Sequence, residues 1–170
     1  MTSTITATTS QLSDLIAGVR SALSTRTRAD LTVRLVADQL RQHLPRPEIL
    51  TAEQRMGDPR QYATHSLHIE PDGSFTIVAL VWRPGQRTRI HDHISWCVFG
   101  VIQGIEHEEL FDRNLKRLGV SENYPGDVSG FAPPGDIHRV RNTGDTTAIS
   151  LHIDGANLAR FGSSVRRYYD

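Results

Sequence analysis

The stretch at residues 85–104, GQRTRIHDHISWCVFGVIQG, constrains the fold more than any other part of the sequence. His91 and His93 are separated by one residue, and side chains alternate between the faces of a β-strand, so both imidazoles are expected to point the same way. The glycines at either end suit tight turns that bring a strand in and out. Two neutral imidazoles on one strand face provide half of a site for a first-row transition metal. The pattern by itself also fits a strand with two exposed histidines.

A second stretch, PPGDIHRVRN at residues 133–142, supplies a third candidate ligand. It contains a Pro-Gly turn and then a single histidine, His138, which enters a short strand that ends in an Asn-Thr-Gly turn. Three imidazoles can hold one metal ion and leave coordination positions open. Neutral imidazole suits iron, zinc, copper and nickel, so the ligand type does not choose the metal.

Together the two stretches resemble the paired motifs of the cupin superfamily. The first motif is matched by Gly85, His91, His93 and Gly104, and the second by Pro133, Gly135, His138 and Asn142. Cys97 stands where the first motif has a glutamate. The resemblance implies a metal-binding cupin whose ligands are His91, His93 and His138. The Cys97 thiolate is a candidate fourth ligand; the alternative is a small buried side chain beside the site.

The rest of the chain fits this architecture. Residues 11–23 and 30–44 carry apolar residues at helical spacing, and residues 51–54 have the spacing of a capping box. From Gln61 onward, many short apolar runs bounded by turns indicate an antiparallel sandwich or barrel. We therefore expect a mainly β fold, a cupin double-stranded β-helix (jelly roll) with an N-terminal helical cap. Residues 1–10 are expected to be a disordered tail, residues 11–58 the cap and residues 59–170 the barrel with a C-terminal tail, in a single domain. A dimer contact is an alternative role for the helices.

Composition narrows the functional classes. The net charge is +0 over 170 residues, so nothing suggests a nucleic-acid or membrane partner. The single cysteine excludes an intramolecular disulfide. The first ten residues, MTSTITATTS, lack the basic start and apolar run of a signal peptide, and no run approaches membrane-spanning length. We expect a soluble, cytoplasmic protein, and the sequence leaves the oligomeric state open.

Residues 62–153 resemble a narrower family, the thiol dioxygenases, which include cysteine dioxygenase and the bacterial 3-mercaptopropionate dioxygenases. The resemblance is carried by Tyr62, Trp82, Pro84, Gly85, the HDHISW stretch, Gln103, Gly104, His138, Arg139, Val140, Ser150 and His152. In that family three histidines hold Fe(II), and both atoms of O₂ pass to the sulfur of a small thiol to give a sulfinate. The resemblance implies an oxidoreductase of cysteine metabolism that uses Fe(II), O₂ and a small thiol, either cysteine or a mercaptocarboxylate.

The family also carries a Ser-x-His-x-Tyr relay near the metal. Ser150 and His152 match its first two members and share a strand face with residue 154, which is Asp154 instead of tyrosine. Asp154 can orient His152, bind a substrate amine, or open the following Asp-Gly turn with its side chain in solvent. An altered relay allows a further oxidised or rearranged product, and nickel then becomes an alternative metal.

Substrate recognition is the least determined feature. Tyr62, Trp96 and Cys97 are expected beside the pocket. Cysteine dioxygenases place an arginine two residues after the tyrosine that Tyr62 matches, but Thr64 occupies that position here. The 3-mercaptopropionate dioxygenases instead use an arginine in the C-terminal segment to bind the substrate carboxylate, and the resemblance implies this role for Arg166 or Arg167, with Arg160 as a further candidate. For each of them the alternative is a solvated surface charge.

Two other functions stay open. The chain can be a cupin enzyme that acts on carbon, against which the missing motif glutamate argues. It can also be a cupin that binds a small ligand without catalysis.

Overall fold

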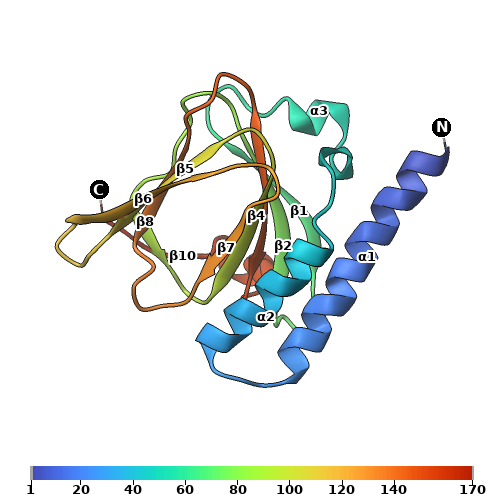
Figure 1. Cartoon of the computed structure of the whole chain (residues 1–170), viewed down its shortest axis with the longest axis horizontal. Helices are drawn as coiled ribbons and strands as arrows, with labels where there is room; N and C mark the ends of the chain where they lie inside the picture. The colour runs from blue at the N-terminus through green and yellow to red at the C-terminus, as the bar shows by residue number, and fades with distance from the viewer. Residues whose placement is uncertain (1, 170) are drawn as a thin grey trace.

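The computed structural model describes residues 2–169, with side chains from Ser10 onward. Two five-stranded antiparallel sheets face each other (Figure 1). Sheet A has the strand order β1-β2-β9-β4-β7 and sheet B the order β10-β3-β8-β5-β6. The strands are β1 (Ala63–Ile69), β2 (Thr76–Trp82), β3 (His91–His93), β4 (Cys97–Gln103), β5 (Glu106–Phe111), β6 (Arg117–Asn123), β7 (Val128–Phe131), β8 (His138–Asn142), β9 (Ala148–Asp154) and β10 (Val165–Tyr168). This arrangement confirms the predicted double-stranded β-helix.

Helices cover the outer face of sheet A (Figure 1). The helical elements are α1 (Thr2–Ser24), α2 (Ala29–Gln42), the 3₁₀ turn η1 (Pro47–Ile49), α3 (Ala52–Arg55) and α4 (Leu158–Phe161). Apolar residues of α1 and α2, such as Leu15 and Leu40, are fully buried in the same core cluster as Leu151 of β9. Gly100 of β4 permits this close packing, because a Cβ atom there would lie 2.7 Å from the Leu44 side chain. The predicted N-terminal helical cap is confirmed.

The start of the chain differs from the expected disordered tail. Helix α1 begins at Thr2, so residues 2–10 continue the helix that the apolar spacing predicted from residue 11. Once the buried turns around Leu15 have formed, each further residue adds one backbone hydrogen bond without a new nucleation cost. The ends of the expected ranges, Met1 and Asp170, lie outside the described residues. Whether the cap and the barrel fold as a single domain stays a prediction.

Local signals in the sequence explain two further elements. The predicted capping box is confirmed, since the Thr51 hydroxyl accepts from Gln54 N at 3.2 Å and the Gln54 side chain accepts from Thr51 N at 2.9 Å. Strand β2 is apolar on both faces because one face packs against the helices and the other lies between the two sheets. Among the described residues, no helix is both long and apolar enough to cross a membrane.

Leu40→Ala tests the packing of the helices on sheet A. Leu40 is fully buried, and we expect its truncation to lower the free energy of unfolding by about 2–5 kcal/mol, because the cavity left behind cannot fully collapse. Urea denaturation measures the loss. Leu31 lies on the same helix and is 45% exposed, so Leu31→Ala should cost less than about 1 kcal/mol. Equal losses for the two variants would contradict the packing of α2 on the sheet.

Candidate metal centre

Three buried histidines meet between the sheets. His91 and His93 lie on β3, and His138 lies on the adjacent strand β8, where it pairs directly with His91. Their ligand nitrogens all lie within 4.8 Å of one another, and none of the three residues is more than 5% exposed. The alternation of side chains on β3 therefore places both of its imidazoles toward the interior, as the sequence predicted.

Each histidine is held through its Nδ1 atom. His91 Nδ1 lies 2.9 Å from the Arg89 carbonyl oxygen, His93 Nδ1 lies 3.2 Å from an Asp136 carboxylate oxygen, and His138 Nδ1 lies 2.6 Å from a Glu108 carboxylate oxygen. A carbonyl or an ionised carboxylate can only accept, so with Glu108 and Asp136 ionised each Nδ1 carries the ring proton and donates it. Each Nε2 atom consequently offers a lone pair toward the other two rings.

The donor set fits a divalent transition metal. Burial, followed by the neighbouring imidazoles, lowers the pKa values of His91 and His138 to about 3, so both rings are neutral, which is the form that binds metals. His91 Nε2 and His138 Nε2 lie 3.2 Å apart. Two metal–nitrogen bonds of about 2.1 Å at roughly a right angle place their nitrogens about 3.0 Å apart. Three lone pairs converge here without a proton between them, and a cation is the partner that satisfies all three.

Sequence reasoning missed two residues that orient the histidines, Glu108 and Asp136. Both are buried, and Asp136 also accepts the backbone N–H of His93 at 2.8 Å. Burial raises the pKa of Glu108, whereas hydrogen bonds from His93 hold the pKa of Asp136 below its usual value against the effect of burial. An acid two residues before His138 was the available signal for Asp136. Glu108 lies 30 positions from its partner, so no local pattern connects the two.

A small pocket adjoins the three histidines, with a volume of about 130 Å³. Its wall includes Tyr62, whose ring centroid lies 4.4 Å from that of Trp82. The segment at residues 162–165 lines another side, where β10 pairs with β3. The volume accommodates a small organic molecule of a few heavy atoms.

The predicted relay lies on β9 and reaches this pocket. His152 lines it, and its Nε2 lies 2.9 Å from the Ser150 hydroxyl oxygen while its Nδ1 lies 3.7 Å from Cys97 Sγ. The ring stacks on Phe99 with centroids 5.5 Å apart. Burial, then the three neighbouring histidines, lowers the pKa of His152 to about 3. The structure thus holds His152 as a neutral hydrogen-bonding group at the edge of the metal site.

Asp154 and Cys97 are neighbours across the β4–β9 pair. Asp154 lines the pocket and is 3% exposed, which contradicts the alternative that places its carboxylate in solvent. Burial raises the pKa of Asp154, and the Cys97 thiol and Ser164 hydroxyl partly offset this through hydrogen bonds. Burial, then the Asp154 charge, raises the pKa of Cys97 well above its usual value, which favours the thiol form beside the site over a thiolate ligand.

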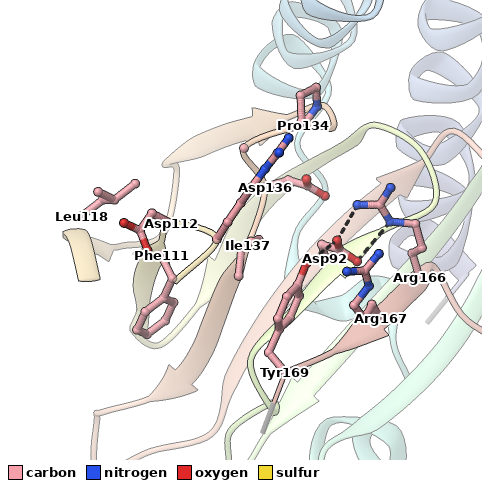
Figure 2. Close-up of a pocket in the computed structure, with 12 residues that line it drawn as sticks. Asp92, Phe111, Asp112, Leu118, Pro134, Asp136, Ile137, Arg166, Arg167 and Tyr169 are labelled. Atoms are coloured by element: carbon pink, nitrogen blue, oxygen red, sulfur yellow. Dashed lines mark hydrogen bonds and ion pairs between the residues drawn. The ribbon is translucent and has the colours of Figure 1, made fainter. Parts of the chain in front are cut away.

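The candidate arginines lie elsewhere. Asp92, between the two histidines of β3, faces away from them; Arg166 Nε donates to it at 3.2 Å and the Tyr169 hydroxyl at 2.8 Å (Figure 2). Arg166 and Arg167 line a separate hollow of about 570 Å³ on that side. Arg160 lies over the ring of Phe161 at 5.6 Å.

The histidine pocket therefore has no arginine among the described residues that line it. Trp96 is likewise absent from that lining and packs against the apolar core, with its indole against Gly155. A side chain at position 155 would collide with the indole, because a Cβ atom there would lie 2.3 Å from it.

Comparison with known proteins gives a family match. The profile of the family described as cysteine dioxygenase type I matches residues 1–161. The chain is 32% identical to cysteine dioxygenase type 1 of Danio rerio, covering 53% of this chain and 49% of that protein. It is 33% identical to the cysteine dioxygenase type 1 of Rattus norvegicus, with the same coverage. The chain thus spans about half the length of these curated relatives.

Solved structures support the fold. A recombinant oxalate oxidase in complex with glycolate superposes with a TM-score of 0.50 at 18% identity, covering 59% of this chain and 53% of that chain. An uncharacterised Klebsiella pneumoniae protein with a double-stranded β-helix domain superposes with a TM-score of 0.50 at 17% identity, covering 64% of this chain and 90% of that chain. At these identities the likeness shows the architecture alone.

His93→Ala tests the assignment of the ligands. Removing one of three converging imidazoles should reduce bound metal at least tenfold, measured by elemental analysis after loading with Fe(II) and gel filtration. His107→Ala is the matched control, because His107 is also a buried histidine paired with a carboxylate, that of Glu122, but lies outside the cluster. Full metal content in His93→Ala would refute the assignment, and the control should retain its metal.

Proposed function

The chain belongs to the cysteine dioxygenase type I family, and from that membership we propose that it is a metal-dependent dioxygenase that adds O₂ to the sulfur of a small thiol. The observation that carries the proposal is the convergence of three buried imidazole nitrogens on a small pocket. The proposed ligands are His91, His93 and His138, and the proposed metal is Fe(II), with nickel as the alternative. When bound, the metal lowers the pKa of the substrate thiol and activates O₂.

The protein contributes orientation and exclusion of water. The neutral histidines leave the charge of a divalent ion uncompensated, which favours an anionic thiolate in the pocket. Tyr62 and Trp82 form an apolar wall against which the carbon atoms of the thiol can pack. His152, kept neutral by burial, can direct a hydrogen bond at the substrate or at oxygen. The thiolate and one O₂ then account for every atom and charge of a sulfinate product.

The pocket wall favours an aminothiol over a mercaptocarboxylate. A substrate carboxylate needs a cationic partner, and no arginine or lysine is among the described residues that line the pocket. Asp154 is the one carboxylate among the described lining residues, at the position of the family tyrosine. A substrate ammonium group beside Asp154 would stabilise the charged form of that buried acid. We propose that cysteamine, an aminothiol without a carboxylate, binds with its amine at Asp154, and that the replacement of the tyrosine leaves room for a product other than plain sulfinate.

Oxygen consumption by the Fe(II)-loaded protein tests the activity. We expect uptake with cysteamine and at least tenfold slower uptake with cysteine and with 3-mercaptopropionate, because the carboxylate of either compound would enter a pocket whose described lining residues include no arginine or lysine. Mass spectrometry on the same samples distinguishes a sulfinate, which gains two oxygen atoms, from a rearranged product. His93→Ala is the inactive control. A metal-filled protein that consumes no O₂ with any thiol would contradict the dioxygenase proposal and favour a cupin that binds a ligand without catalysis.

Asp154→Asn tests the recognition of the amine. Loss of a buried charge-assisted hydrogen bond of about 1.5–3 kcal/mol corresponds to a rise in the KM for cysteamine of roughly 10- to 150-fold. Asp145→Asn, in an exposed turn, is the control and should leave the KM unchanged. An unchanged KM in an active Asp154→Asn protein would show that Asp154 does not bind the amine, while leaving the oxidation of thiols intact.

A further inference from the structure

Glu106 is a buried carboxylate outside the proposed ligand set. It is the first residue of β5 and is fully buried. Neither of its carboxylate oxygens makes a hydrogen bond of good geometry with the described residues. Buried ionisable groups in folded proteins are usually paired with a partner. A buried carboxyl group without a hydrogen-bond partner therefore indicates either a functional role or a protonated, neutral group.

Glu106 faces the relay across the interior of the sandwich. Trp82 Nε1 donates to Ser150 Oγ at 3.3 Å, and the Ser150 hydroxyl and Trp82 indole both lie close enough to Glu106 to lower its pKa. Burial is the larger effect and, with the charge of Glu108 on the same strand, raises the pKa of Glu106 to about 7. Asn123 on β6 and Asn142 on β8 pair directly with Glu106 and are uncharged.

The groups near Glu106 connect it to the pocket by way of Ser150. On β9, His152 lies beyond Ser150, while β2 presents the uncharged Trp82. His107 and Glu122 pair with each other, and strand alternation puts His107 on the opposite face of β5. The hydrogen-bonded series Ser150–His152–Cys97 thus leads from beside Glu106 to the wall of the metal pocket.

The protons in this chain have two consistent arrangements. A serine hydroxyl has one proton to donate and two lone pairs. When Glu106 is ionised it accepts the Ser150 proton, Ser150 Oγ accepts from Trp82 Nε1 and from a protonated His152 Nε2, and His152 Nδ1 is left without a proton on the side of Cys97. When Glu106 is protonated it donates to Ser150, the Ser150 proton turns to His152 Nε2, and the ring proton moves to Nδ1.

We propose that Glu106 is a positioning residue of the metal pocket, and that the ionisation of its carboxyl group sets, through Ser150, which ring nitrogen of His152 carries the proton. One proton on Glu106 thereby determines whether His152 Nδ1 donates or accepts at the side of Cys97. The assignment concerns the protein's own hydrogen-bond chain, so it stands independently of the substrate and of the oxidation reaction.

Nitrogen-15 NMR of histidine-labelled, full-length protein loaded with diamagnetic Zn(II) tests the proposal without any assay of activity. In the wild type we expect the His152 nitrogens to exchange their protonated and unprotonated shifts between about pH 6 and 8, with the proton on Nδ1 at low pH and on Nε2 at high pH. A His152→Gln variant assigns the signals. A wild-type His152 that keeps one tautomer throughout this range would overturn the proposal.

Glu106→Gln should abolish the transition and hold His152 in the Nδ1-protonated form, because its amide can donate to Ser150 at every pH. Glu122→Gln, an acid on the neighbouring strand that pairs with His107, is the matched control and should retain the transition. A transition that persists in folded Glu106→Gln would assign the titration to another group and refute the role of Glu106. Should Glu106→Gln fail to fold, the Ser150→Ala variant decides, since removal of the linking hydroxyl must also abolish the transition.

Discussion

The structure depends on three imidazole nitrogens brought together without a proton between them. A hydrogen-bond acceptor at Nδ1 orients each imidazole ring. The acceptor is a carbonyl oxygen for His91 and a buried carboxylate for His93 and for His138. With the protons committed to these acceptors, the Nε2 lone pairs face one another and require a shared cation. Burial also lowers the pKa values of His91 and His138, so these two rings stay neutral.

The two sheets contribute different parts of the site. Sheet B carries the histidines on β3 and β8, together with Glu108 on β5. Sheet A carries Ser150, His152 and Asp154 on β9, in the middle of a sheet whose outer face is covered by helices. The described residues of α1 and α2 do not line the metal pocket. Their apolar side chains pack on the outer face of β9 and β2, and this packing holds in place the strand that carries Ser150, His152 and Asp154. A pocket wall with an acid and no arginine among its described residues distinguishes the recognition expected here from that of a carboxylate-binding site.

Local patterns were sufficient for the architecture and for the cluster. The His-x-His spacing and the alternation on β9 depend on a strand period of two residues, and the resemblance to the second cupin motif joins His138 to the first pair. Those patterns predicted that the three histidines gather and that Ser150, His152 and residue 154 share a face, and the structure brings each group together. The helix start was placed too late, because helix propagation through Thr2–Ser10 leaves no mark in apolar spacing.

The sequence by itself determined the fold class, the family and the identity of the converging histidines. Strand alternation paired His91 with His93, and the resemblance to the cupin and thiol dioxygenase motifs supplied the family and added His138. Tertiary structure decided the rest. Glu108 reaches His138 across 30 positions, and Glu106 meets Ser150 only when the sheets close. Arg166 was expected at the substrate, but its strand places it behind β3 on Asp92 (Figure 2). Such contacts depend on which strands become neighbours and on which face a residue lies, and no local pattern specifies the first of these.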